Sequence, residues 1–339
     1  MPLTGVFFIP SNPNASTALA TVTERLNSVF ADEATPVSRW ALEHKLMRDT
    51  PSCLPPSGSQ RPTAPKIMQF LSLTYYPNHG FIYASHPSTD GGPGTATPST
   101  VPPTPSSSQS SQQAPGSTKT PMVMTTVPLS STGALYQHFA YACQPFWAPR
   151  HTVTVPNGVV YEIGDFRVRV GDVRQTQPAA RVRGTVFEIE WRGPSLVTTL
   201  SGLYQARRLK KAKASNPYTW DVGENADANG EDEDSGIDMA FPDGVEEADI
   251  DAEYAVTASL IREFWAKLGV EGAREAILVP DVGKEVKARL RELKKQQSEQ
   301  NVGSLGHEDG SGQMMDEDSD PDAGVDVARQ FMEIFRFNR

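Results

Sequence analysis

The stretch from residue 152 to residue 191 constrains the fold most, because apolar and polar residues alternate along its short segments. Between Phe166 and Val170 the alternation is strict, with three apolar residues on one side and two arginines on the other. A period of two residues is typical of a β-strand with one buried face. The pattern predicts four strands: Thr152–Val155, Val159–Ile163, Phe166–Val170 and Arg181–Trp191. The Pro-Asn-Gly sequence at 156–158 predicts a tight hairpin turn between the first two.

The alternation changes phase inside the last of these strands. Val182 and Val186 have the same parity as Glu188, whereas Arg183 has the same parity as Phe187. One extra residue in a strand exchanges its two faces. A β-bulge at Gly184 would therefore give this strand one continuous apolar face.

The order of elements repeats along the chain. A strand at Leu3–Ile9 precedes an amphipathic helix at Ala15–Phe30 and a hairpin around Pro77–Gly80. A strand at Met122–Val127 precedes a helix from Ser131 toward Phe146 and then the strands described above. We predict an α+β fold, mostly antiparallel β-sheet, with two similar halves of strand, helix and strands. The apolar faces of such a meander are most easily buried if the sheet closes into a barrel with flanking helices. An open twisted sheet is the alternative.

Four tracts rich in Pro, Ser, Gly or acidic residues interrupt this order, at about 51–65, 86–120, 221–252 and 301–323. Such tracts bury too little apolar surface to offset chain entropy, so we expect them to be disordered. The prediction is a single barrel-like domain over residues 1–300 that contains the first three tracts as inserts. Residues 301–323 then form an acidic tether to a short docking helix at 324–339.

Charge is distributed unevenly along the chain, whose formal net charge is −10. Residues 221–255 hold 14 acidic residues and residues 301–326 hold 8, without a Lys or Arg in either segment. The remaining 19 acidic residues face all 31 basic ones, so a basic folded body carries acidic segments. These segments either keep the protein soluble or mask or mimic the surface of a partner.

The cysteine count and the hydropathy pattern indicate the compartment. The two cysteines, Cys53 and Cys143, exclude a disulfide framework and a multi-cysteine zinc site, which fits a reducing environment. The first residues, MPLTGVFFIP, lack the basic start and the long apolar core of a secretory signal. Since no stretch approaches the roughly 18 apolar residues of a spanning helix, we expect a soluble intracellular protein and no membrane partner.

The sequence contains no recognisable arrangement of catalytic or metal-binding residues. The glycines at 91–94 lack the preceding strand, the Lys and the following helix of a phosphate-binding loop. The six histidines are scattered without the spacing of metal ligands. We therefore predict a protein that is not an enzyme, with no catalytic, cofactor-binding or metal-binding residue and no cofactor.

One set of charged residues, on the polar faces of the predicted strands, is open to three interpretations. It consists of Glu162, Arg167, Arg169, Arg181, Arg183, Glu188 and Glu190. The interpretation that we favour is a solvated sheet face with ion pairs across strands. The second is a contact with another protein. The third places these side chains inside a wide barrel, where they would bind metal and triphosphate, as in a tunnel-type phosphohydrolase acting on RNA 5′ triphosphates.

The dense basic run at Arg207–Lys213 is compatible with a nuclear localisation signal, a phosphate-binding patch or a solvated helix edge. The chain has no zinc finger and no RNA-recognition aromatics, so we expect no direct sequence-specific nucleic-acid binding. A nucleic-acid-binding barrel remains an alternative, because the folded body is basic.

Two groups of apolar residues are candidates for partner binding. Phe146 and Trp147 follow the predicted second helix and lie between Pro145 and Pro149. Farther along, amphipathic helices are predicted at 253–268, 281–297 and 327–337. In the last of them Phe331, Ile334 and Phe335 share one face, which suits docking into a groove. The groove belongs either to the protein's own barrel, which we favour, or to a partner.

The segment Tyr161–Trp191, YEIGDFRVRVGDVRQTQPAARVRGTVFEIEW, resembles the fungal form of the Mediator subunit 20 family. The segments MPLTGVFFIP, GFIYAS, MVMTTVPL and ARQFMEIFRF resemble the same family. The resemblance implies a barrel-like fold akin to TATA-binding-protein-related factors, and residence in the nucleus. It also implies a place in the Mediator head module, tight pairing with subunit 18 and proximity to a helix of subunit 8. We therefore expect a non-enzymatic subunit that scaffolds contacts between transcription regulators and RNA polymerase II.

Overall fold

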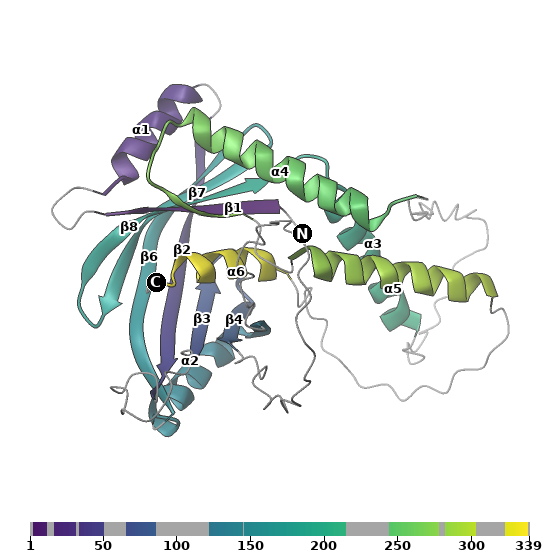
Figure 1. Cartoon of the computed structure of the whole chain (residues 1–339), viewed down its shortest axis with the longest axis horizontal. Coiled ribbons are helices and arrows are strands. Elements are labelled where there is room, and N and C mark those ends of the chain that lie inside the picture. Colours follow the sequence, from purple (N-terminus) through teal and green to yellow (C-terminus); the bar gives the residue numbers. More distant parts are fainter. Residues whose placement is uncertain are drawn as a thin grey trace, which may run out of the picture.

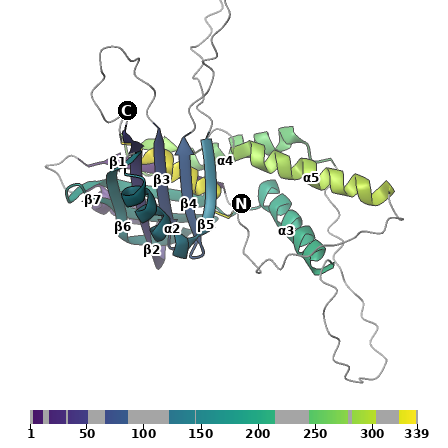
Figure 2. The ribbon, with the colours of Figure 1, turned by 90° about the horizontal axis from the view of Figure 1, so that it is seen from below.

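The computed structural model describes residues 3–11, 17–31, 34–50, 66–85, 122–144, 146–214, 244–277, 282–302 and 323–337. The predicted inserts at 51–65 and 86–120, residues 221–243 of the third insert and residues 303–322 of the predicted tether lie outside these ranges. The described strands form one antiparallel sheet in the order β5-β4-β3-β2-β6-β7-β8-β1-β9 (Figures 1 and 2).

The strands are β1 Leu3–Pro10, β2 Thr35–Asp49, β3 Ile67–Leu73, β4 His79–Ser85, β5 Met122–Pro128, β6 Trp147–Ile163, β7 Phe166–Gln177, β8 Arg181–Trp191 and β9 Arg274–Ala276. The helices are α1 Leu19–Val29, α2 Leu129–Gln137, α3 Leu196–Ala214, α4 Glu247–Lys267, α5 Val282–Val302 and α6 Val325–Ile334, with a π-helical turn, η2, at His138–Ala142.

The two predicted halves are confirmed, and the sheet shows how they are joined. The first half runs β1, α1, β2, β3, β4 and the second runs β5, α2, β6, β7, β8. The halves meet where β2 pairs with β6. Each half also gives its first strand to the other, because β1 pairs with β8 and β5 pairs with β4. Because of this exchange neither half forms a separate sheet, and the strands of both belong to one sheet.

The prediction of a hairpin turn at residues 156–158 is wrong. These residues lie inside one long strand, β6, whose register with its neighbour β7 shifts between Thr154 and Val159. Both flanks of the segment follow β2, with Val155 opposite Leu42 and Gly158 opposite Trp40. The glycine is needed for contact with an aromatic ring, since any side chain at Gly158 would collide with the Trp40 indole.

The predicted bulge in β8 is confirmed. Its register with β7 shifts where Val173 pairs with Gly184 and the next residue, Arg174, pairs with Val182. Gly184 has φ +156° and any side chain there would collide with the Ile9 carbonyl, so glycine is required. Beyond the bulge Val186 faces one core cluster and Phe187 the other, so the strand is buried on both sides.

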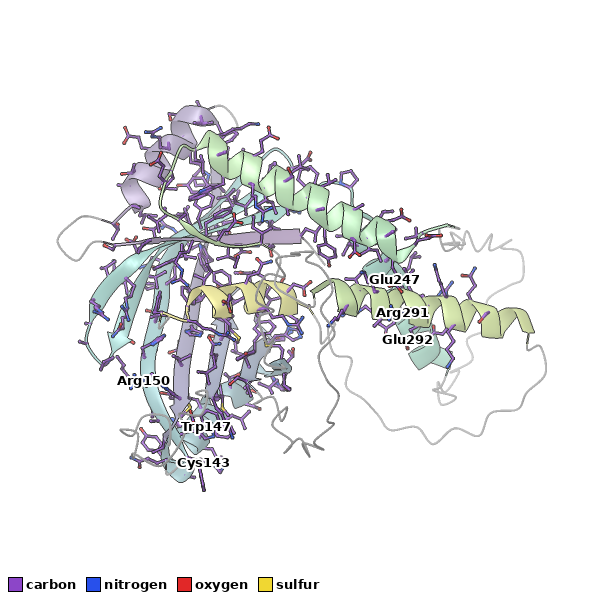
Figure 3. The ribbon with its side chains drawn as sticks, in the orientation of Figure 1. Cys143, Trp147, Arg150, Glu247, Arg291 and Glu292 are labelled. Atoms are coloured by element: carbon purple, nitrogen blue, oxygen red, sulfur yellow. The ribbon has the colours of Figure 1, made fainter. Side chains whose placement is uncertain are left out.

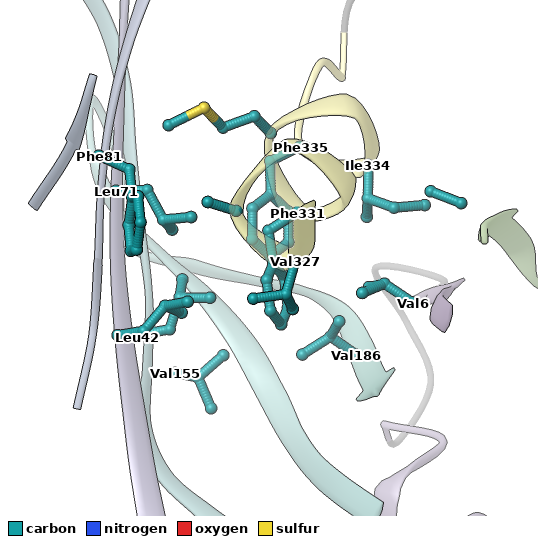
Figure 4. Close-up of a cluster of buried hydrophobic side chains, with 14 of the residues drawn as sticks. Val6, Leu42, Leu71, Phe81, Val155, Val186, Val327, Phe331, Ile334 and Phe335 are labelled. Carbon is teal, nitrogen blue, oxygen red and sulfur yellow. The ribbon is translucent and has the colours of Figure 1, made fainter. Parts of the chain in front are cut away.

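The prediction of a closed barrel is wrong: the sheet is open, with β5 and β9 at its two edges. A barrel fills its own interior with side chains, whereas here α6 lies against the concave face of the sheet (Figure 1). Apolar side chains from both halves pack on α6 in one cluster that includes Val6, Leu42, Leu71, Val155 and Val186 (Figure 4). Because α6 covers this face, the sheet does not have to close on itself.

The opposite face of the sheet packs against α1 and the C-terminal half of α4, with Phe7, Val170 and Phe187 buried beneath them. The N-terminal half of α4 packs instead with α3 and α5. The third predicted insert therefore ends earlier than expected, because α4 begins at Glu247. Asp249 accepts a hydrogen bond from the Glu246 backbone there, so the acidic residues start the helix.

A candidate protein-interaction surface

Between Lys119 and Arg150 the sequence contains no Asp, Glu, Lys or Arg. The structure places most of this segment together at one end of the molecule, as the edge strand β5, α2, η2 and the start of β6. Figure 3 shows Cys143 and Trp147 at this end, next to Arg150, where charge resumes. We call β5, α2, η2 and Phe146 the uncharged surface. Depletion of charge is the main compositional mark of an interface core.

The inner side of the uncharged surface is anchored on the sheet by aromatic packing. The ring of Phe70 on β3 meets those of Tyr136 and Phe139 at centroid distances of 5.5 and 6.2 Å. Trp147 packs on the edge of the same cluster. The Lys45 ammonium lies 4.8 Å from the centre of the Tyr136 ring. These contacts fix α2 and η2 in position.

The outer side carries no Asp, Glu, Lys or Arg and exposes large apolar side chains to solvent. Tyr141 is 78% exposed and Phe146 is 68% exposed, and Val123 on β5 and Leu129 on α2 are exposed as well. None of the residues of α2 is fully buried. Since β5 lies at the end of the strand order, its outer edge pairs with no strand of the described chain. A protein partner can cover such a face, with its exposed large apolar side chains beside an open strand edge.

The structure separates the two aromatic residues that the sequence placed together. Phe146 points away from the core, whereas Trp147, the first residue of β6, is half-buried against it. The patterns in the sequence missed Tyr141, Val123 and Leu129. Apolar residues spaced three and four apart indicate the buried face of a helix, so this pattern does not identify exposed apolar residues. The absence of charge from 120 to 149 is the signal that could have found them.

The other predicted partner-binding residues, Phe331, Ile334 and Phe335, are buried under the chain's own sheet (Figure 4). They lie on α6, of whose ten residues nine are buried. The Gln330 side-chain amide donates hydrogen bonds to the carbonyls of Thr4 and Ile277, both at 2.8 Å. The alternative that we favoured was docking on the protein's own barrel, and the helix docks on the open sheet that stands in its place. A role of these residues in partner binding stays a prediction.

The charged strand face was expected to be solvated, and this prediction is wrong for its central residues. Arg169, Glu188 and Glu190 are all buried on the concave side. The Arg169 guanidinium lies 2.6 Å from the Glu188 carboxylate and 2.7 Å from the Glu190 carboxylate. Glu188 also accepts a hydrogen bond of 2.7 Å from the Tyr75 hydroxyl. We call these four residues the buried ion cluster.

Burial dominates the electrostatics of the buried ion cluster. It raises the pKa of Glu188 against the opposing effect of Arg169, and it raises the pKa of Tyr75 well above its ordinary value. Near it, Gly324 at the start of α6 has φ +81° and touches the Tyr76 ring closely enough that a side chain would collide. The space over this face is therefore filled by protein atoms.

A pair of histidines lies under the end of α6. The His44 and His151 ring centroids are 5.9 Å apart, and both rings lie near Phe335 or Phe337. His44 Nε2 is 2.8 Å from the Gln69 side-chain oxygen. Burial, and after it the neighbouring His151, lowers the pKa of His44 from 6.5 to about 3. Burial and then Arg183 lower the pKa of His151 to about 4, so both rings are neutral in the fold.

Within the described ranges, no group of three or more His, Cys, Asp or Glu side chains could hold a metal ion. None of the helices in the same ranges is long and apolar enough to cross a membrane. Most side chains of the basic run Arg207–Lys213, on α3, lie outside the described residues.

The fold defines the class of the protein: a mixed α+β chain with a large antiparallel sheet and flanking helices. Within that class the chain belongs to the Mediator subunit 20 family, because the family model described as "TATA-binding related factor (TRF) of subunit 20 of Mediator complex" matches residues 1–336. Membership makes the chain a subunit of the Mediator coactivator in transcription regulation and implies a nuclear location. Subunits of this family are structural transcription cofactors and are not known enzymes.

No curated protein matched the chain. Among solved structures, the chain is similar to one described as "Structure of PH1819 protein from Pyrococcus Horikoshii OT3". The sequence identity is 9% and the TM-score is 0.24, over 61% of this chain and 88% of the other. A similarity at this level carries no argument about function.

Proposed function

We propose that the chain is a non-enzymatic scaffold of the Mediator head module that binds another Mediator subunit through the uncharged surface. By the family resemblance the partner is subunit 18, with a helix of subunit 8 nearby. Through this heterodimer the chain would transmit contacts between transcription regulators and RNA polymerase II. The observation that supports the proposal most is the exposure of Phe146 and Tyr141 in a segment without charged residues.

Water in contact with exposed aromatic side chains raises the free energy of such a surface. The free energy falls when a partner covers exposed aromatic side chains. Large aromatic residues dominate the binding energy of interfaces. The aromatic anchors beneath hold α2 and η2 in place, so binding would order few additional groups. The open edge of β5 adds unpaired backbone groups that an extended segment of the partner can pair with.

The test is the affinity for subunit 18 of the variant with Phe146→Ala and Tyr141→Ala together. We expect a loss of about 30-fold or more, because truncation of one aromatic anchor typically costs about 2 kcal/mol. The matched control is Val256→Ala on α4, whose side chain is 60% exposed but lies away from the uncharged surface. Equal loss in the two variants, or no loss in either, would remove the uncharged surface as the interface.

The phosphohydrolase alternative needs open space over the charged strand face, which α6 occupies in this structure. The purified protein should therefore release no phosphate from triphosphorylated RNA, with or without manganese. Turnover that disappears in Glu188→Gln would reinstate that alternative. The nucleic-acid alternative needs basic side chains gathered in one groove, and no described arrangement favours it over the uncharged surface.

A further inference from the structure

A small cavity opens where the last turns of α4 meet the β6–β7 turn and the end of α1. In Figure 1, α1 and the adjoining end of α4 lie at the far end of the molecule from α2. The volume of the cavity is about 200 Å³. Pockets for cofactors and drug-sized ligands measure about 300 to 1,000 Å³, so this one has the size for a single side chain. It lies on the opposite face of the sheet from α6, and none of the functions discussed above uses it.

The walls of the cavity are mainly aromatic. Phe30, Phe166 and Phe264 line it together with Ile163 and Leu260. The rings of Phe30 and Phe264 stack at 4.8 Å with an interplanar angle of 7°, and Phe166 meets Phe264 at 4.8 Å. Phe264 is buried and belongs to the core under α4, which makes the wall rigid. Phenylalanine rings present a negative electrostatic face that attracts cations.

The rim of the cavity is acidic. Asp165 comes from the β6–β7 turn and Glu263 from α4, with one base, Lys267, beside them. Among the described residues no ion pair involves the Asp165 carboxylate. Glu263 and Lys267 form an ion pair of 3.3 Å whose side chains are 63% and 56% exposed, and pairs so exposed contribute little. Because α4 ends at Lys267, the negative end of its dipole also faces this site.

We propose that this cavity binds one cationic side chain, Lys or Arg, that a protein partner presents. The aromatic walls and the two carboxylates favour a positive head group, and the apolar walls accept the methylene stem that carries it. An anionic group would meet Asp165, Glu263 and the end of α4. A neutral apolar group would offer no charge to the Asp165 carboxylate, and Glu263 would keep only its exposed pair with Lys267.

The test uses the free protein, so its outcome does not depend on the interface with subunit 18. The probes are N-acetyl-arginine methylamide and N-acetyl-lysine methylamide, each with a neutral analogue of similar shape, citrulline and norleucine respectively. Binding is followed by NMR through the methyl groups of Ile163 and Leu260, which line the cavity. We expect saturable shifts with the cationic probes and at least about fivefold weaker binding of the neutral ones.

Variants locate the effect. Asp165→Asn with Glu263→Gln should weaken the cationic probes about fivefold, whereas Lys267→Met should strengthen them, because it removes a competing charge. Glu24→Gln with Glu271→Gln changes the net charge equally at exposed residues outside the cavity and should have no effect. Equal binding of charged and neutral probes, an equal loss in both double variants, or no saturable shift at the two methyl groups would each overturn the proposal.

Discussion

The helices α2 and α6 reverse the usual relation between charge and burial. The segment with α2 has no charged residue, yet none of the nine residues of α2 is fully buried. Helix α6 contains Asp326, Arg329 and Glu333, yet nine of its ten residues are buried. Burial of charge is costly unless partners are present, so the polar groups of α6 must be met by this chain itself. An uncharged helix has no such requirement, so its exposed side can be buried by another protein.

The two helices therefore differ in how far this chain itself covers them: α6 is enclosed by the fold, whereas α2 is covered on one side only. Around α6 the sheet supplies both apolar contacts and hydrogen bonds, from residues as distant as Thr4. Around α2 the sheet supplies aromatic contacts on one side only. Substitutions on α6 should change the stability of the fold, and substitutions on α2 should change association with a partner.

The largest effect on stability is expected from Phe331→Ala. Phe331 is fully buried between α6 and the sheet, so truncation removes apolar contacts and leaves a cavity. We expect a loss of about 4 kcal/mol in the free energy of unfolding, measured by urea denaturation. Phe146→Ala removes the same ring from the uncharged surface and should change that free energy by less than about 0.5 kcal/mol. Similar losses in the two variants would break the comparison.

A smaller loss, about 3 kcal/mol, is expected from Arg169→Met, which leaves two buried glutamates without their cation. The measurement is again urea denaturation. Additional replacement of Glu188 and Glu190 by Gln should recover most of the loss, since no buried charge then remains. Arg262→Met breaks the exposed ion pair with Glu275 and serves as the control, with an expected loss below about 1 kcal/mol. A loss no greater than that of the control would show that the cluster's charges are balanced by something else.

The effect that is smallest near neutral pH is a dependence of stability on pH that arises under α6. The pKa of His44 is lowered to about 3 and that of His151 to about 4. In the unfolded chain both titrate near their ordinary value of about 6.5, so below that pH the unfolded state binds more protons. Stability is therefore complete above about pH 6.5 and falls as the pH drops toward 4, by up to about 1.4 kcal/mol per pH unit for each histidine.

His44→Gln should reduce this slope between pH 6.5 and 5, measured as the free energy of unfolding at each pH. Val256→Ala, at an exposed position of α4 without a titratable group, is the control and should leave the slope as it is. Equal slopes in wild type and His44→Gln would show that His44 is protonated without cost, and the view of α6 as a closed core would have to be revised.

Local patterns in the sequence predicted much of the fold. Alternation located the strands, the phase change located the bulge at Gly184, and the repeated order of elements revealed the two halves. The hairpin at 156–158 was wrong because Asn-Gly also suits a strand irregularity when a ring such as Trp40 needs the space. The barrel was wrong because no local pattern shows that a helix near residue 330 fills the concave face.

The candidate surface was harder to predict than the fold. Phe146 and Trp147 were chosen because they follow the predicted second helix and lie between prolines; the structure exposes Phe146, whereas Trp147 faces inward, and their role in binding stays a prediction. The burial of Arg169, Glu188 and Glu190 could not be seen, because a strand with charges on one face looks solvated until the element that covers it is known. Tertiary packing decides such positions, and the sequence records it only indirectly.

The hydrogen bonds between Thr4 and Gln330 also have a consequence for how the chain folds. They join residues 326 positions apart, so the contact closes a very large loop. The chain loses the entropy of loop closure before the contact stabilises the fold. Chains dominated by such contacts fold slowly. Until α6 arrives, the concave face of the sheet exposes its apolar side chains. During that interval, rather than in the finished fold, the free chain should be most prone to aggregate.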